Sequence, residues 1–171
     1  MCPQKYILGD EMKKCVFSGT FDPPTTGHKK IIETCLKLFD EVVVAVMINT
    51  DKTPLLSIKQ RKCLLEKLFA DEKRIRVETF EGAAVDILEK ENTPFYVRGV
   101  RNTIDFEYEN ANFFANKKLK NDIITLYVPA EQDSLQISST LVKNSVKFKK
   151  DYSEYIPEEI AQDFEDMIKN V

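Results

Sequence analysis

The chain has 171 residues, the size of a single domain that can bury a substantial core. Its content of 43% hydrophobic and 31% charged residues is typical of a globular protein and excludes a largely disordered chain. The formal net charge of −3 argues against general nucleic-acid binding, which favours a strongly basic domain, but leaves room for a local basic pocket.

Residues 1–11 carry no secondary-structure pattern and no apolar segment of the kind found in secretory signals. We expect them to be a poorly ordered extension that precedes a single domain at residues 12–171. The longest aliphatic run, "VVVAVMI" at 42–48, is too short to span a bilayer. The cysteines form no C-x-x-C pair, and most of them lie inside apolar patterns, which favours a reducing compartment. These features predict a cytoplasmic protein without a membrane partner.

Strands and helices are predicted to alternate along the chain. Short apolar runs indicate strands at 13–17, 41–48, 74–80, 94–99 and 122–129. Helical spacing of apolar residues indicates helices at 28–39, at 58–70 with Ser57 as its cap, at 83–92, within 103–119, at 139–147 and at 157–169. The largely β-branched run at 41–48 is typical of a strand buried on both faces of a parallel sheet. The pattern therefore predicts an α/β fold: a single Rossmann-like domain whose five-stranded parallel sheet has helices on both faces, followed by C-terminal helices.

The glycines exclude two common phosphate-binding devices. There are only five of them: Gly9, Gly19, Gly27, Gly82 and Gly99. Neither G-x-G-x-x-G nor G-x-x-x-x-G-K-[ST] can be written with this spacing. The chain is therefore neither a dinucleotide-binding dehydrogenase nor a P-loop protein.

Four polar segments follow predicted strands. They lie at 18–28, 49–54, 98–109 and 137–143, and each supplies basic or hydroxyl groups. The first, "SGTFDPPTTGH", ends in the only histidine of the chain, His28. Ordinary turns, a loop lysine and a helix cap explain each segment separately. Parallel sheets of this type bind ligands at the carboxyl ends of their strands, so the four segments together predict a site for a phosphorylated ligand.

These segments resemble those of a known family. "GTFDPPTTGH", "DKTP", "RGVRNTIDFEYE" and "ISSTLVK" are similar, in order and spacing, to signature segments of the bacterial phosphopantetheine adenylyltransferases. The resemblance runs from about Lys13 to the C-terminus. The segment 25–28 matches the (H/T)-x-G-H motif of the wider nucleotidyltransferase superfamily, whereas "RGVR" followed by "DFEYE" is specific to the family.

The resemblance implies transfer of the adenylyl group of ATP to 4′-phosphopantetheine, which gives dephospho-coenzyme A and pyrophosphate in the penultimate step of coenzyme A biosynthesis. The acceptor phosphate attacks the α-phosphorus in line, without a covalent enzyme intermediate. Mg²⁺ is expected to accompany ATP, held by phosphate oxygens and water rather than by a dedicated protein metal site. Family members are usually homohexamers, and feedback binding of coenzyme A at the same site is also implied.

The resemblance also implies roles for individual residues. Catalysis is assigned to His28, Lys52 and Arg101. ATP is expected to contact Thr20, Phe21, His28, Gly99, Val100, Arg101, Glu109, Ser134, Leu135, Gln136, Ile137, Ser138, Ser139 and Thr140. The acceptor is expected to contact Thr20, Lys52, Ala84 and Arg98. The residue types suit this chemistry, because arginine forks, a mobile lysine and helix N-termini neutralise phosphate charge.

The acidic segment "DFEYE" has more than one interpretation. Asp105 lies four residues after Arg101, so an i,i+4 ion pair is expected to hold that arginine in place. Glu109 matches a position that contacts ATP in the family, while Glu107 fits a solvated helix face. Two departures from the family pattern are the pair Pro23-Pro24 and the stretch 130–136, which is about one residue longer and lacks an aromatic residue. The second departure concerns contacts to the adenine.

Alternative functions share some of these motifs. "ISST" suits a nicotinamide mononucleotide adenylyltransferase equally well, and a glycerol-3-phosphate cytidylyltransferase shares the histidine motif. The intact "RGVR" and "DFEYE" favour the phosphopantetheine family over both. A class I aminoacyl-tRNA synthetase would need a tRNA-binding extension that this length does not accommodate. A non-catalytic nucleotide-binding module would be expected to lack His28, Lys52 or an arginine, and a plain α/β domain would leave the four segments as coincidence.

Overall fold

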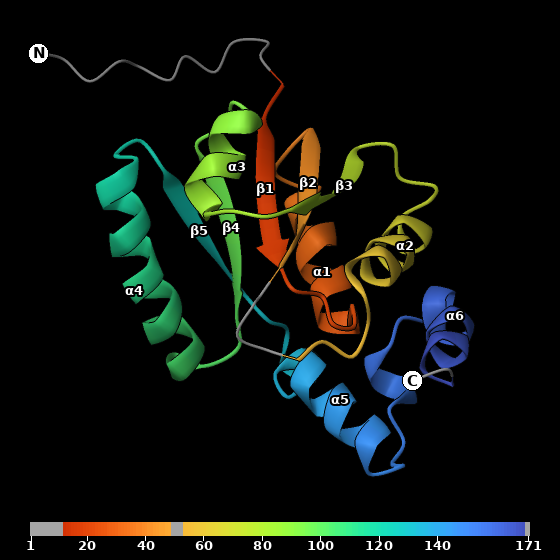
Figure 1. Ribbon diagram of the computed structural model, residues 1–171. Coiled ribbons are helices and arrows are strands. Elements are labelled where there is room, and N and C mark those ends of the chain that lie inside the picture. The colour runs from red at the N-terminus through yellow and green to blue at the C-terminus, as the bar shows by residue number, and fades with distance from the viewer. Residues whose placement is uncertain (1–11, 49–52, 170–171) are drawn as a thin grey trace, which may run out of the picture.

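The computed structural model describes residues 12–48 and 53–169 (Figure 1). The predicted extension at 1–11 and the candidate residue Lys52 lie outside the described residues. The strands are β1 (Lys14–Gly19), β2 (Glu41–Met47), β3 (Ile75–Phe80), β4 (Phe95–Val100) and β5 (Ile124–Pro129). The helices are α1 (Thr26–Cys35), α2 (Ile58–Leu68), α3 (Ala84–Lys90), α4 (Thr103–Leu119), α5 (Ser139–Lys147) and α6 (Glu158–Ile168). Two short 3₁₀ turns, η1 (Gln132–Ser134) and η2 (Ser153–Tyr155), were not expected from the sequence.

The five strands form one parallel sheet in the order β3-β2-β1-β4-β5, which confirms the predicted fold. The chain runs outward from β1 to β3 and then crosses to β4 on the other side, so the strand order reverses beside β1. Ligands of open α/β sheets bind in the crevice outside such a reversal. β1 and β4 pair through Val16 with Tyr96 and Phe17 with Val97, which brings the segments that follow these strands to one crevice.

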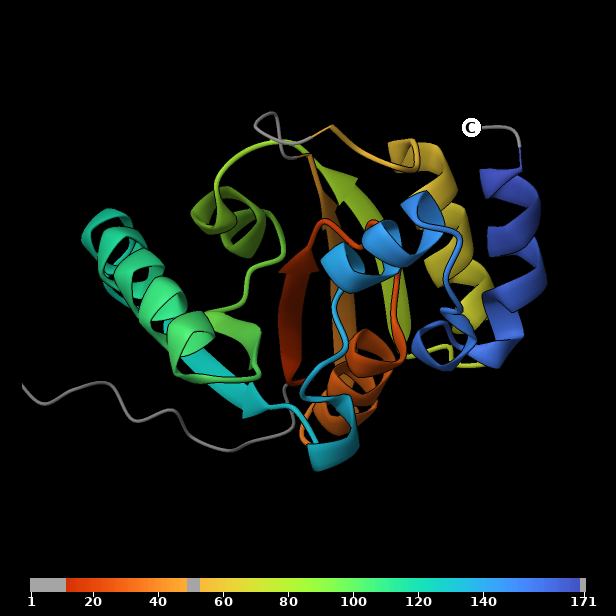
Figure 2. The same cartoon turned by 90° about the horizontal axis from the view of Figure 1, so that it is seen from below.

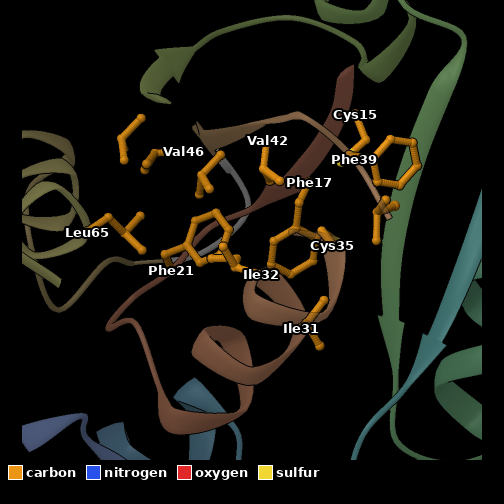
Figure 3. Packing of buried hydrophobic residues seen from close by; sticks show 13 residues of the cluster. Cys15, Phe17, Phe21, Ile31, Ile32, Cys35, Phe39, Val42, Val46 and Leu65 are labelled. Atoms are coloured by element: carbon orange, nitrogen blue, oxygen red, sulfur yellow. The ribbon is translucent and has the colours of Figure 1, made fainter. Parts of the chain in front are cut away.

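Helices cover both faces of the sheet, because successive residues of a strand point to opposite sides. One core cluster joins Phe17 of β1 to Ile32 of α1 and Leu65 of α2 (Figure 3). A second cluster, on the other face, contains Val16 of the same strand and Val85 of α3. The alternation of a single strand between two cores thus confirms that the sheet is buried on both faces.

The C-terminal helices pack on the outer side of α2 rather than on the sheet. Leu64 of α2, Val142 of α5 and Phe164 of α6 belong to one buried cluster. Figure 1 shows α6 beside α2, and in Figure 2 α5 lies in front of the end of the sheet to which β1 points. The predicted C-terminal helices are therefore confirmed, and α5 closes one side of the crevice.

Helix α1 begins at Thr26, two residues before the predicted start. Thr25 has an extended backbone, and its Oγ1 accepts a hydrogen bond from the backbone N–H of His28 at 3.4 Å. The side chain of His28 in turn accepts one from the backbone N–H of Thr25 at 3.1 Å. This reciprocal capping box satisfies two N–H groups that a helix start otherwise leaves unpaired. His28 is consequently the third residue of the helix rather than its first.

Helix α4 exposes several large apolar side chains. Glu109 is its only buried residue, while Ile104, Tyr108, Phe114 and Leu119 are each more than half exposed. Within the described ranges, no helix is both long and apolar enough to cross a bilayer. The apolar side of α4 therefore lies on the surface of the folded chain.

Candidate active site

A cavity of about 370 Å³ lies at the carboxyl ends of β1 and β4. Segments 18–28, 98–109 and 137–143 all contribute to its lining, as their predicted placement required. The candidate residues that line it are Thr20, His28, Arg98, Gly99, Arg101, Glu109, Ser134, Ile137, Ser138, Ser139 and Thr140. The strand order therefore brings together most of the residues that the sequence singled out.

His28 lines this cavity with its ring held in one orientation. Its Nδ1 accepts the backbone N–H of Thr25, and Thr25 Oγ1 lies 3.0 Å from the same nitrogen. The ring also packs edge-on against Phe21, with 4.9 Å between centroids. Because Nδ1 is an acceptor, we assign the neutral ring proton to Nε2. His28 thus offers an N–H donor to a ligand in the cavity.

The electrostatic surroundings keep this imidazole neutral. Burial lowers the pKa of His28 from 6.5 to about 4, and the positive charges of Arg101 and Arg98 act in the same direction. A neutral N–H group can donate a hydrogen bond to a phosphate without first losing or gaining a proton. Among the described residues, the cationic side chains that line the cavity are therefore the arginines, and His28 can serve as a neutral hydrogen-bond donor in the same cavity.

Arg98 is held on three sides. Its Nε and Nη2 donate to the two carboxylate oxygens of Glu109 at 2.7 and 2.5 Å, and its Nη1 donates to the backbone oxygen of Ser18 at 2.5 Å. The Oγ of Ser18 and the hydroxyl of Tyr96 lie 2.6 Å apart beneath the guanidinium. Burial acts to lower the pKa of Arg98, but Tyr96 and Glu109 outweigh it and raise the pKa above its usual value. The guanidinium is thus a fixed positive charge in the cavity wall.

Arg101 is fixed by a local ion pair. Its Nε and Nη2 donate to the carboxylate of Asp105 at 2.7 and 3.0 Å, which confirms the predicted i,i+4 pair. The hydrogen bonds from Arg101 hold the pKa of Asp105 below its usual value. Nη1 of Arg101 also donates to the backbone oxygen of Ile137 at 3.3 Å. Arg101 therefore connects the start of α4 to the segment that leads into α5.

The hydroxyl groups at the start of α5 have mainly structural partners. Ser138 caps the helix by accepting the backbone N–H of Leu141 at 3.1 Å. Ser139 donates to the backbone oxygen of Pro23 at 2.8 Å, which ties α5 to the segment after β1. Thr140 is exposed and lines the cavity. An anion at this helix start would meet backbone N–H groups and the Thr140 hydroxyl.

Other candidate residues lie away from the cavity lining. The Phe21 side chain is 1% exposed and packs in the core, so the predicted ATP contact is left to its backbone. Ala84 begins α3 and packs against the second core cluster. Val100, Leu135 and Gln136 are not among the lining residues. Their predicted ligand contacts stay predictions.

Two charged residues beneath the site were missed from the sequence. Asp22 accepts the backbone N–H groups of Leu55 at 3.0 Å and Leu56 at 2.8 Å, and it pairs with Lys143 at 3.2 Å. Arg61 is only 5% exposed and lies in α2. A signal for Arg61 was present, because its spacing places it on the same helical face as apolar residues that the helix buries.

The chain is similar to several characterised groups of proteins. The cytidylyltransferase-like family model matches residues 16–145. A phosphopantetheine adenylyltransferase of Flavobacterium johnsoniae is 36% identical over 149 residues, which cover 87% of this chain and 97% of the relative. That of Clostridium perfringens is 34% identical over 160 residues, covering 94% and 98%. That of Nautilia profundicola is 38% identical over 150 residues, covering 88% and 97%.

A solved structure shares the fold. It is that of a Vibrio parahaemolyticus protein assigned as a nicotinate-nucleotide adenylyltransferase, with a TM-score of 0.65 over 89% of this chain and 97% of that one. The sequence identity is 23%, so this similarity shows the fold alone.

Proposed function

Because the chain belongs to the phosphopantetheine adenylyltransferase family, within the cytidylyltransferase-like group, we propose that ATP and 4′-phosphopantetheine bind and react in its cavity. The chain is an adenylyltransferase that forms dephospho-coenzyme A and pyrophosphate. The observation that carries the assignment of roles is the placement of Arg98, Arg101 and His28 around one cavity at the reversal of strand order. Two fixed cations and a neutral donor suit a site that must hold two phosphorylated substrates together.

Each of the two arginines binds a different substrate. Arg101 and the backbone N–H groups at the start of α5 bind the β- and γ-phosphates of ATP, because both lie along the same wall of the cavity. Arg98 and Thr20 bind the phosphate of 4′-phosphopantetheine on the β1 side. Lys52, which lies outside the described residues, is proposed to add a positive charge that binds the acceptor phosphate.

The chemistry needs no nucleophile from the protein. An oxygen of the acceptor phosphate forms a bond to the α-phosphorus of ATP, while the bond from that phosphorus to the bridging oxygen breaks and pyrophosphate leaves. Negative charge builds on the oxygens of the five-coordinate phosphorus during this exchange. The Nε2–H of His28 donates to these oxygens, and the arginines stabilise the same charge from either side.

Mg²⁺ fits this site as a partner of ATP rather than of the protein. Asp105 and Glu109, the acidic residues that line the cavity, are both engaged by arginine forks. Among the described residues, no cluster of three or more acidic, histidine or cysteine side chains is arranged to hold a metal. Mg²⁺ bound with ATP would neutralise phosphate charge and would be held by phosphate oxygens and water. The protein residues orient the nucleotide around it.

A pyrophosphate-release assay tests the acceptor. The protein is mixed with Mg·ATP and, separately, with 4′-phosphopantetheine, nicotinamide mononucleotide or glycerol 3-phosphate, the last also with CTP. Release with 4′-phosphopantetheine alone supports the proposed function. Release with another acceptor keeps the transferase chemistry but contradicts the substrate. No release from folded protein that still binds ATP would favour a non-catalytic nucleotide-binding module.

We also propose that the chain assembles as a homohexamer and works in the cytoplasm. The exposed apolar side chains of α4, among them Ile104 and Phe114, support self-association because water-exposed apolar surface favours burial. Sedimentation equilibrium measures the assembly directly, and a monomer at micromolar concentration would contradict it. Competition between coenzyme A and ATP for the cavity tests the implied feedback.

A further inference from the structure

Arg61 is a buried charge that the mechanism above does not use. It lies on the inner face of α2, where Leu64, Leu65 and Leu68 are its buried neighbours. Its side chain extends from this apolar face toward the carboxyl ends of β1 and β2, and the residue is only 5% exposed. Burial of a guanidinium is costly unless it has specific partners, so its contacts need an explanation.

One nitrogen of Arg61 joins two strand ends. Its Nη1 donates to the backbone oxygen of Thr20 at 2.8 Å and, over a longer distance of 3.4 Å, to that of Met47. Thr20 directly follows β1, and Met47 is the last residue of β2. The two strands are paired up to Gly19 and Val46, so these two carbonyl groups lie side by side just beyond the ladder.

Thr20 needs such a donor because the chain turns sharply after it. Phe21 has a φ of +49°, a conformation that few residues other than glycine adopt. This turn takes the Thr20 carbonyl out of the ladder, and a carbonyl in the protein interior requires a partner. Thr20 itself lines the cavity, on the side assigned to the acceptor phosphate. The guanidinium thus holds the backbone of a residue that lines the ligand cavity.

The remaining surroundings of Arg61 do not fully compensate the burial of its guanidinium. Burial lowers the pKa of the guanidinium, and the Asp22 carboxylate partly offsets this effect. The Nε is buried and has no hydrogen-bond partner within the described part of the chain. Arg61 is therefore buried at a cost to stability, which is expected where its other contacts serve a site.

We infer that Arg61 is a positioning residue, which holds Thr20 and the end of β2 in the arrangement that binds the acceptor phosphate. This inference rests on the proposed function, since it assigns Thr20 to 4′-phosphopantetheine. Arg61 does not line the cavity and acts through the backbone of Thr20. The same guanidinium also contacts the carbonyl of Met47, the last residue of β2.

The test compares Arg61→Lys with the wild-type enzyme and with Arg74→Lys. Lysine keeps the charge, but its ammonium nitrogen lies one bond nearer to the backbone than Nη1 of arginine, so it cannot reach the two carbonyl oxygens with the same geometry. Arg74 is an exposed arginine that pairs with Glu72 and serves as the matched control. We expect Arg61→Lys to raise the KM for 4′-phosphopantetheine and lower kcat, together by about tenfold in kcat/KM, with the KM for ATP within about twofold. Arg74→Lys should leave both substrates unaffected.

A double-mutant cycle with Thr20→Val distinguishes positioning from a general effect. Valine keeps the shape of threonine but lacks the hydroxyl that Arg61 is proposed to position. If Arg61 acts through Thr20, Arg61→Lys should reduce kcat/KM for 4′-phosphopantetheine by a much smaller factor in the Thr20→Val background. Thermal unfolding of each variant, followed by circular dichroism, reports the fold separately.

The outcomes separate this inference from the proposed function. A wild-type enzyme without activity on 4′-phosphopantetheine would overturn the proposed function. An active wild type, with an unchanged acceptor KM in Arg61→Lys, would overturn the positioning role. Equal losses toward ATP and the acceptor, or strictly additive effects in the cycle, would make Arg61 a purely structural residue and would also overturn it.

Discussion

His28 combines two tasks in one side chain. Its Nδ1 completes the capping box of α1, and its Nε2–H is left to face the cavity. A helix cap and a ligand contact are usually supplied by different residues. Here the cap orients the ring, because the hydrogen bond from Thr25 fixes both its rotation and its tautomer. The only histidine of the chain is therefore held in one orientation, as its proposed role as a hydrogen-bond donor requires.

Replacing His28 with alanine should slow the reaction without unfolding the protein. Loss of one hydrogen-bond donor to a transition state lowers kcat by about 10²–10³. His28→Asn is the matched control for the cap, because its side-chain oxygen can accept the Thr25 N–H while nothing replaces Nε2–H. Steady-state kinetics should show both variants to be slow, with His28→Asn the more stable of the two. Near-full activity in either variant would contradict the role of His28.

The sequence identified Glu109 as a site residue but did not identify its partner in the structure, Arg98. The resemblance implies a contact with ATP, whereas the structure places both carboxylate oxygens on Arg98. The two roles differ in their consequences. If Glu109 fixes Arg98, its replacement should change the KM for 4′-phosphopantetheine, the substrate that Arg98 is proposed to bind. If Glu109 contacts ATP, its replacement should change the KM for ATP.

Glu109→Gln distinguishes these roles. Glutamine has nearly the same size but offers Arg98 a single acceptor and no negative charge, so the guanidinium should become less well fixed. We expect the KM for 4′-phosphopantetheine to rise about tenfold, with a smaller change for ATP. Glu107→Gln, on the exposed face of the same helix, is the control and should have no effect. An increase confined to the KM for ATP would instead support the contact that the resemblance implies.

At the scale of elements, the segment after β1 is held by side-chain contacts from two helices, α2 and α5. α2 reaches it through Arg61, and α5 reaches it through Ser139 and Lys143. Asp22 accepts N–H groups from the residues just before α2. The loop that joins β1 to α1 is thereby tied to α2 and α5. The geometry of the cavity therefore depends on contacts that do not touch the ligand.

Asp22→Ala should destabilise the fold through this junction. Removal of the carboxylate leaves the N–H groups of Leu55 and Leu56 without an acceptor, which should lower the free energy of unfolding by about 2–4 kcal/mol. Urea denaturation measures this change. Lys143→Met removes only the partly exposed cation and should lower it by less than about 1 kcal/mol. Equal effects of the two substitutions would show that the amide contacts of Asp22 are unimportant.

At the scale of the whole molecule, stability should depend on pH through His28. Burial lowers the pKa of His28 from 6.5 in the unfolded chain to about 4 in the folded protein. Between these values the unfolded state binds more protons, so the free energy of unfolding falls as the pH is lowered. Carboxylates with lowered pKa values, such as that of Asp105, add a further loss below about pH 4.

Urea denaturation of wild type and His28→Asn at pH 7 and pH 5 checks this dependence. Asparagine does not titrate, so the variant should lose less stability between these two pH values than wild type does. Both proteins should lose stability further below pH 4. Identical losses between pH 7 and pH 5 would show that the His28 ring remains free to take up a proton in the folded state.

Features that arise from neighbouring residues could be predicted from the sequence. The alternation of strands and helices follows from local apolar spacing, and helices α4 and α5 agree with the predicted ranges. Ser57 caps α2 as predicted, and Arg101 pairs with Asp105 one helical turn away. Helical geometry brings such residues together whatever the rest of the chain does.

Features that depend on distant segments could not be predicted in this way. The pairs Arg98–Glu109, Arg61–Thr20 and Lys143–Asp22 are separated by 11, 41 and 121 residues. The sequence predicted that four segments form one site, but the strand order that brings 18–28, 98–109 and 137–143 to one cavity is a property of the folded sheet. By itself the sequence determined the elements, the motif and the family, because these are written in local spacing and residue type. Only the tertiary structure decided which carboxylate holds which arginine and which carbonyls Arg61 joins, because packing of the whole sheet brings these groups within hydrogen-bond distance.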